Sequence, residues 1–207
     1  MGRHQPVEQL AEHRANPNLL VFRPADFVET VECWKIALSS VSTPSLLALT
    51  RQAVKQVRSN FDLENLCAKG AYVLCSSGDN KEFDVTIFAT GSELSIGKEV
   101  YENIFNIGVS TRLVSVPCME LFFRQSPEYI NSLLCSSKLK VAIEVGSSFG
   151  WHRIIGYDGI FCGVDTFGLS GPYKDLYEYF HITAEDITAR IKERIHAENI
   201  DSISYKN

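Results

Sequence analysis

Two basic side chains in the first quarter of the sequence offer the clearest possibilities for ligand chemistry. His4 precedes Gln5-Pro6, and an imidazole there can donate to or accept from a substrate oxygen. A surface histidine near a frayed end is the simpler reading. Arg51 follows the apolar run 45–50, which is typical of a buried strand. Ligands bind at the carboxyl ends of strands in open α/β sheets, and arginine suits bidentate recognition of phosphate, but a surface salt bridge fits that placement equally well.

The turn Arg23-Pro24-Ala25-Asp26 contains opposite charges. We expect Arg23 to form an ion pair with Asp26 in preference to a ligand contact, and Asp26 to cap the helix that follows. Ser92, in the turn Ala89-Thr90-Gly91-Ser92-Glu93, is expected to cap a second helix. That turn lacks the glycine spacing of the nucleotide-binding motifs, so a nucleotide site is not indicated.

Polar residues in the second half lack the partners that catalysis needs. Glu144 and His152 lie on adjoining predicted elements and could meet, but they form no triad without a nucleophile. Gly168-Leu169-Ser170-Gly171 is one residue short of the G-x-S-x-G spacing and is more simply a turn. Four bulky apolar residues are predicted to be core or interface residues: Met119, Phe122, Phe123 and Trp151.

The composition is that of a soluble globular protein, with 45% hydrophobic and 22% charged residues. A net charge of −5 without a basic cluster argues against a nucleic-acid partner. No apolar run approaches the ~20 residues needed to span a bilayer, and the first residues lack the apolar core of a signal peptide, so we expect a cytoplasmic protein. Without zinc-ligand spacing, the cysteines are expected to be reduced and mostly buried: Cys33, Cys67, Cys75, Cys118, Cys135 and Cys162.

Apolar periodicity predicts an α/β fold in two parts. A strand at 19–22, a helix at 27–38 and a strand at 45–50 form a β-α-β unit, which implies a parallel pair. We place this incomplete domain at 1–55, a polar linker at 56–70 and a second domain at 71–207. The second domain alternates strands, expected at 71–76, 83–90, 110–115, 140–145 and 159–164, with helices, expected at 93–106, 127–134, 151–155, 173–180 and 184–196. Two strands cannot cover both faces of a parallel sheet, so residues 1–55 are expected to pack on the second domain or on another chain.

Several motifs, taken together, resemble those of the transketolase family in order and spacing. In the first part they are His4-Gln5-Pro6-Val7-Glu8-Gln9-Leu10, Phe22-Arg23-Pro24-Ala25-Asp26, Trp34-Lys35-Ile36-Ala37-Leu38 and Leu49-Thr50-Arg51-Gln52. In the second part they are Ala89-Thr90-Gly91-Ser92-Glu93, Val116-Pro117-Cys118-Met119-Glu120-Leu121-Phe122, Gly150-Trp151 and Gly163-Val164-Asp165-Thr166-Phe167-Gly168. The resemblance covers nearly the whole chain.

The resemblance implies the end of a pyrimidine-binding domain, built on a partial parallel sheet, followed by a mixed-sheet C-terminal domain of the transketolase type. It implies that His4 hydrogen-bonds oxygens at the reacting end of the sugar and that Arg51 binds the sugar phosphate. Full-length members bind thiamine diphosphate with Mg or Ca. The family's metal–diphosphate motif and pyrimidine-activating Glu have no match here, so we expect no complete catalytic, cofactor or metal site. Met1-Gly2-Arg3 stands where the family has Asp-Gly-Pro-Thr.

The implied activity is transfer of a two-carbon ketol unit from a ketose phosphate to an aldose phosphate, in the pentose phosphate pathway and in a homodimer. We expect this sequence to be a fragment that is inactive alone and that needs the missing N-terminal domains. A non-catalytic assembly or dimerisation module, or the C-terminal subunit of a split enzyme, is the alternative. Sugar phosphates would be partners only of the complete enzyme, and no nucleic acid or membrane contact is expected.

Overall fold

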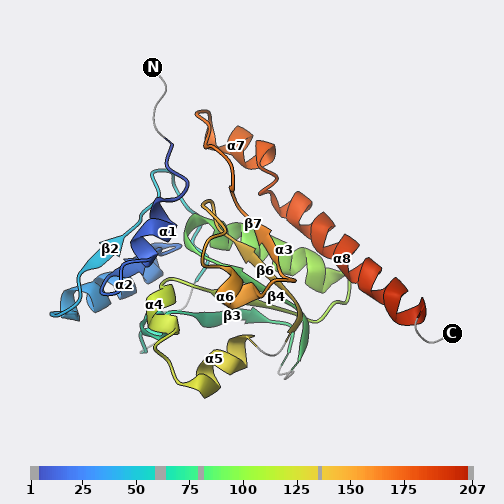
Figure 1. Ribbon diagram of the computed structural model, residues 1–207, viewed down its shortest axis with the longest axis horizontal. Coiled ribbons are helices and arrows are strands. Elements are labelled where there is room, and N and C mark those ends of the chain that lie inside the picture. Colours follow the sequence, from blue (N-terminus) through green and yellow to red (C-terminus); the bar gives the residue numbers. More distant parts are fainter. Residues whose placement is uncertain (1–4, 59–63, 79–81, 135–136, 205–207) are drawn as a thin grey trace.

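Residues 5–56 form a small β-α-β unit (Figure 1). The computed structural model describes residues 5–58, 64–78, 82–134 and 137–204, with side chains described as far as residue 197. The elements of this unit are α1 Gln9–Arg14, β1 Leu20–Phe22, α2 Phe27–Ser39 and β2 Ser45–Leu47. The two strands are parallel, with Leu20 opposite Ser45. The predicted β-α-β unit is confirmed, although β2 ends at Leu47 rather than at residue 50.

Asp26 begins α2 and ties it to the segment that follows the unit. One carboxylate oxygen accepts from Glu29 N at 3.0 Å, which is an N-cap hydrogen bond. The other accepts from the backbone of Val57 at 3.1 Å and of Arg58 at 2.9 Å. The predicted cap is therefore confirmed. The predicted Arg23–Asp26 ion pair is wrong, because these backbone donors occupy the Asp26 carboxylate and Arg23 has other partners.

The C-terminal part forms a five-stranded mixed sheet in the order β3-β5-β4-β6-β7. Strand β3 runs antiparallel to β5, and the other neighbours are parallel. The strands are β3 Tyr72–Ser76, β4 Phe83–Ala89, β5 Thr111–Ser115, β6 Ser137–Ile143 and β7 Ile160–Cys162. The helices are η1 Leu66–Lys69, η2 Gly91–Glu93, α3 Leu94–Asn106, α4 Met119–Phe122, α5 Pro127–Leu134, α6 His152–Ile155, α7 Tyr173–Tyr179 and α8 Ala184–Ser204.

These elements confirm the predicted mixed α/β fold, with differences at their ends. The strand expected at 140–145 lies at 137–143, and the last helix continues to Ser204 rather than ending at residue 196. Ser92 does not cap α3, because the chain first makes the 3₁₀ turn η2, whose N-cap is Thr90. The Ser92 hydroxyl instead donates to Glu93 Oε1 at 2.6 Å.

Both faces of the five-stranded sheet are covered. Side chains alternate along β4, so Val85 and Ile87 pack with α3 and α8 on one face. Phe88 packs with α4, α5 and α6 on the other face. Trp151 and Phe122 are fully buried in this second layer, Met119 is buried and Phe123 is half-buried, which confirms the prediction that these residues belong to the core.

The first unit packs on the C-terminal part through a mixed apolar and polar junction. Phe22 and Cys33 are buried in one cluster with Tyr72 of β3. Glu29 of α2 is also buried there and accepts hydrogen bonds from Ala25 N at 2.7 Å and from the Tyr72 hydroxyl at 2.7 Å. The expectation that this unit packs on its own second domain agrees with this junction.

The opposite side of α2 is uncovered. Phe27, Val31, Trp34 and Leu38 follow one another at helical spacing and are 65%, 48%, 49% and 76% exposed. Val31, Trp34 and Leu38 are apolar residues at helical spacing, yet among the described residues it is the side of α2 that carries Val28 and Cys33 that packs on the chain. We refer to the four exposed residues as the α2 face.

Five cysteines lie in the described part, and all are free thiols. Cys33, Cys67, Cys118 and Cys162 are buried and Cys75 is half-buried, which confirms the expectation for these residues; Cys135 lies outside the described residues. No helix in the described part is long and apolar enough to cross a membrane.

Candidate functional site

A cleft of about 670 Å³ lies between the first unit and the C-terminal part. One wall is the segment before α1 together with α1 itself, a second is the loop Thr50–Gln52 after β2, and a third is α7. Arg23, the turn Gly91–Glu93 and Val145 lie between these walls. Apolar and aromatic side chains supply much of the lining, among them Leu10, Leu49, Leu169, Tyr173, Leu176, Tyr177, Phe180 and Ile182.

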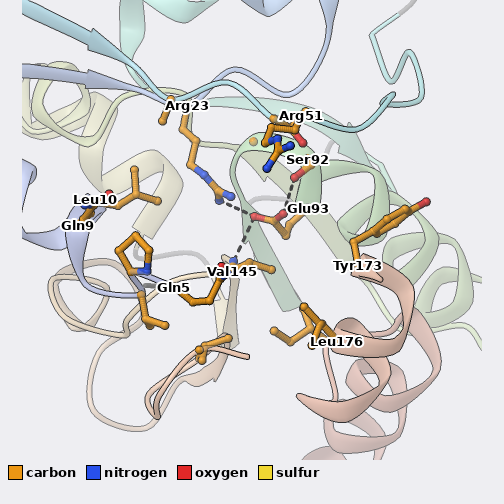
Figure 2. A pocket seen from close by; sticks show the side chains of 18 of the residues that line it. Gln5, Gln9, Leu10, Arg23, Arg51, Ser92, Glu93, Val145, Tyr173 and Leu176 are labelled. Carbon is orange, nitrogen blue, oxygen red and sulfur yellow. Dashed lines mark hydrogen bonds and ion pairs between the residues drawn. The ribbon is translucent and has the colours of Figure 1, made fainter. Parts of the chain in front are cut away.

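Arg51 lines this cleft with an exposed side chain. Figure 2 shows it beside Ser92, with Tyr173 and Leu176 on the facing helix α7. Among the residues that the structure describes, Arg51 has no hydrogen-bond or ion-pair partner. The surface salt bridge that was the alternative to an anion-binding role for Arg51 is thus not formed within the described residues. His4, the other predicted substrate residue, lies outside the described residues.

Glu93 lies at the centre of the cleft and is completely buried. Its Oε2 accepts from the guanidinium of Arg23 and from Val145 N, the latter at 3.1 Å, as Figure 2 shows. Its Oε1 accepts from the Tyr177 hydroxyl at 2.8 Å, in addition to Ser92. Glu93 therefore joins the turn after β1, the end of β6 and helix α7.

Glu144 forms the second carboxylate centre and is also buried. It accepts a bidentate pair from Arg14 of α1 at 2.7 and 2.8 Å, and a bond from Trp151 Nε1 at 2.6 Å. Arg23 Nη1 lies 3.4 Å from its Oε1. Burial would raise the pKa of Glu144, but the charges of Arg14 and Arg23 and the hydrogen bonds outweigh it and hold that pKa below its ordinary value.

These two carboxylates occupy equivalent positions in the sheet. Glu93 follows β4 and Glu144 follows β6, and these strands are parallel neighbours. Open α/β sheets usually bind ligands at the carboxyl ends of such strands. Here the side chains of Arg14 and Arg23, from the first unit, occupy that edge. The carboxylates at this edge are therefore paired within the chain, and the cleft lined by Glu93 and Val145 lies beside these pairs.

Glu144 and His152, which the sequence allowed to meet, have other partners in the structure. Glu144 binds the indole of Trp151 instead, while His152 is exposed and its ring stacks on Tyr157 at a centroid distance of 6.2 Å. A short helix turns successive side chains away from one another, so the neighbour of Trp151 points outward. Ser170 lies in a loop, as expected, and accepts from Gln5 Nε2 at 3.0 Å.

The geometry suits binding of an anion rather than catalysis by protein groups. An exposed arginine without a partner can form charge-assisted hydrogen bonds to a phosphate or carboxylate. Glu93, which lines the same cleft, is already paired with Arg23. The described residues contain no group of three or more His, Cys, Asp or Glu side chains that could hold a metal ion.

Two family models match the chain. A model described as "Transketolase-like TK C-terminal domain" matches residues 70–183, and one described as "Transketolase, pyrimidine binding domain" matches residues 2–56. The chain belongs to the transketolase family. The first model alone covers more than half of the chain, and the fold described above is that of these transketolase domains.

Known transketolases match almost all of this chain, and the match covers only part of each of them. A transketolase of Sinorhizobium medicae is 47% identical over 92% of this chain and 27% of its own length. A Pichia stipitis transketolase solved in complex with sedoheptulose 7-phosphate has a TM-score of 0.81 and 36% identity, over 92% of this chain and 27% of that one. A "Split gene transketolase, inactive beta4 tetramer" is similar in fold, with a TM-score of 0.72 and 24% identity, over 91% of this chain and 61% of that one. The chain thus spans about a quarter of the length of the curated relative.

Proposed function

We propose that this chain supplies the C-terminal part of a transketolase, which transfers a two-carbon ketol unit between sugar phosphates in the pentose phosphate pathway. The observation that carries the proposal is the continuous match to a transketolase over 92% of the chain, at 47% identity. The match of the pyrimidine-binding domain model to residues 2–56 includes the positions of both predicted substrate residues, His4 and Arg51. A cytoplasmic location and a homodimer stay predictions.

Within this activity, we assign binding of the sugar phosphate to Arg51. Its guanidinium is exposed in a cleft and has no partner among the described residues, which favours an external anion. His4 would hydrogen-bond oxygens at the reacting end of the sugar, as the family resemblance implies. The two side chains would then hold opposite ends of one substrate.

The chain matches the pyrimidine-binding domain model over residues 2–56, but the family's metal–diphosphate motif and its pyrimidine-activating Glu have no counterpart in this sequence. In the family, thiamine diphosphate supplies the nucleophilic carbon when bound, and a divalent metal holds its diphosphate. The described residues do not fit that role, since they include no cluster of metal-ligand side chains. We therefore infer that the 207-residue chain does not turn over by itself. The inactive tetramer of a split-gene transketolase is a precedent from another protein of this fold.

An activity assay with added domains tests the proposal. The purified chain, given thiamine diphosphate, magnesium, xylulose 5-phosphate and ribose 5-phosphate, should give no turnover. Addition of the N-terminal and pyrimidine-binding segments of the Sinorhizobium medicae relative should restore it. In the restored enzyme, Arg51→Ala should raise KM for the phosphorylated sugars about tenfold or more, because a charge-assisted contact is lost. Lys55→Ala is the control, since the Lys55 side chain is 76% exposed and pairs with Glu99. Appreciable turnover by the chain alone would refute the inactivity.

A second candidate is a non-catalytic assembly module, and the α2 face favours it. Four large apolar side chains in one exposed row are typical of a surface that another polypeptide covers. In this case the chain would associate with itself or with a separate subunit of a split enzyme, and no sugar phosphate would bind at Arg51. Sizing by light scattering discriminates, because a well-behaved monomer at high concentration counts against assembly.

A further inference from the structure

The segment that follows His4 rests on two loops of the C-terminal part, one after β6 and one after β7. The backbone oxygen of Val7 accepts from Ser147 N at 3.2 Å, in the first loop. The side-chain amide of Gln5 donates to Ser170 Oγ at 3.0 Å, in the second loop. His4 is joined to Gln5 by a peptide bond, so the contacts that fix Gln5 also limit how far the His4 side chain can reach.

Backbone and side-chain hydrogen bonds hold these two loops together. Val164 N donates to the oxygen of Gly146 at 2.9 Å, and Ser148 N donates to Asp165 Oδ1 at 2.7 Å. The loops also start from neighbouring parallel strands, since β6 pairs with β7. The segment before α1 therefore lies on one joined surface rather than on two independent loops.

Gly168 is the point at which this surface comes closest to the segment. A Cβ atom at Gly168 would lie 2.8 Å from both the Cβ and the backbone oxygen of Gln5, and 3.3 Å from Val7 Cγ2. Carbon atoms in contact are normally about 3.5–4.0 Å apart, so any side chain at this position would push the Gln5 backbone away. The absence of a side chain at Gly168 thus permits the observed approach of Gln5.

We propose that Gly168 and Ser170 are positioning residues for His4. Gly168 admits the Gln5 backbone at this short distance, and Ser170 holds the Gln5 side chain, so the chain next to His4 is fixed at the cleft. Figure 2 shows Gln5 and Arg51 lining that cleft. This inference rests on the proposed function, because it takes His4 and Arg51 to hold the two ends of one sugar phosphate. Gly168 and Ser170 act through Gln5 and do not touch the sugar.

The test is steady-state kinetics of the restored enzyme with Gly168→Ala in this chain. We expect kcat/KM for xylulose 5-phosphate to fall about tenfold, because displacement of a substrate-positioning group by a fraction of an ångström to about 1 Å has effects of that order. The inhibition constant of inorganic phosphate should stay within about twofold, since Arg51 is untouched. Gly171→Ala is the matched control, because it adds the same methyl group nearby, where the nearest atom would be a side-chain carbon of Leu176 at 3.5 Å.

A double-mutant cycle with His4→Ala separates positioning of the imidazole from a general structural effect. If Gly168 acts through His4, Gly168→Ala should change kcat/KM by less than about twofold once the imidazole is removed. A loss of the same size in both backgrounds would overturn the positioning role, because the effect would not pass through His4.

Ser170→Ala is a milder variant that removes one exposed hydroxyl and no backbone contact. It should lower kcat/KM about threefold, as expected for one lost hydrogen bond, and this loss should also vanish in the His4→Ala background. Ser170→Ala carries the same test if urea unfolding shows that Gly168→Ala does not fold.

The proposed function and the positioning role fail in different ways. If His4→Ala lowers kcat/KM while Gly168→Ala and Ser170→Ala leave it unchanged, the positioning role is overturned and His4 stands as a substrate residue. A loss in Gly171→Ala equal to that in Gly168→Ala would also contradict the positioning role. An inactive restored enzyme, or one in which His4→Ala has no effect, would overturn the proposed function of this site and the inference with it.

Discussion

The two sheets use the carboxyl ends of their parallel strands in opposite ways. After β2, Arg51 stands exposed in a cleft and has no partner within the described part of the chain. After β4 and β6, Glu93 and Glu144 are buried and are neutralised by arginines of the first unit. The same place in an α/β sheet is thus open to ligands in one unit and serves as an internal joint in the other.

This difference explains how an incomplete sheet is held in place. Two strands with one covering helix bury little apolar surface of their own. The first unit gains its position from the junction around Phe22 and from the Arg14 and Arg23 contacts with the C-terminal sheet. The ion pairs of Glu93 and Glu144 with arginines of the first unit therefore hold that unit in place. Arg51, which follows β2 in the same unit, is exposed in the cleft.

The largest effect on stability should come from breaking the joint, by which we mean the ion pairs of Arg14 and Arg23 with Glu93 and Glu144. Glu144→Ala leaves the guanidinium of Arg14 buried without its bidentate partner, and Arg23 loses one of its two carboxylates. Removal of one member of a buried ion pair costs about 3–5 kcal/mol, so the free energy of unfolding in urea should fall by about that amount. The control is Glu99→Ala, which removes an exposed pair with Lys55 and should cost about 0–1 kcal/mol. Equal losses in the two variants would contradict the joint.

A smaller, graded effect should follow from pH. The folded-state pKa of Glu144 lies below its ordinary value of 4.5, which approximates the unfolded chain. The pairing therefore stabilises the fold above about pH 4.5, and this stabilisation disappears as the pH falls through the folded-state pKa. Urea unfolding between about pH 6 and pH 3 should show a decline in stability that is flatter in Glu144→Gln. Identical slopes in the two proteins would show that other carboxylates cause the decline.

Local sequence rules predicted the features whose partners are near in the chain. The cap at Asp26 uses a backbone N–H three residues away, and the β-α-β unit follows from apolar runs and their lengths. In both cases, short-range backbone geometry decides the outcome. For Arg51, a position after an apolar run allowed either a ligand contact or a surface salt bridge, and the structure places it beside a cleft.

The contacts of Arg23 with Glu93 and Glu144 could not be predicted, because they join residues that are far apart in the sequence. Arg23 binds Glu93 and Glu144, which are 70 and 121 positions away in the sequence, whereas Asp26 is close by and of the right charge. Which acid it meets depends on how the two units dock, and no local pattern encodes that. Glu144 itself was noticeable as an acid that directly follows an apolar strand, but the sequence gives no sign that its partners are arginines of another unit.

The smallest effect on stability should come from a substitution on the α2 face, which lies on the side of the first unit away from these ion pairs. Leu38 is 76% exposed on the α2 face, so Leu38→Gln loses few contacts and keeps a good helix former. The free energy of unfolding of the monomer should change by less than about 0.5 kcal/mol. If the α2 face serves assembly, light scattering at high concentration should show the variant less associated than the wild type. A stability loss above about 1 kcal/mol in dilute solution would instead mean that this face is covered within the chain.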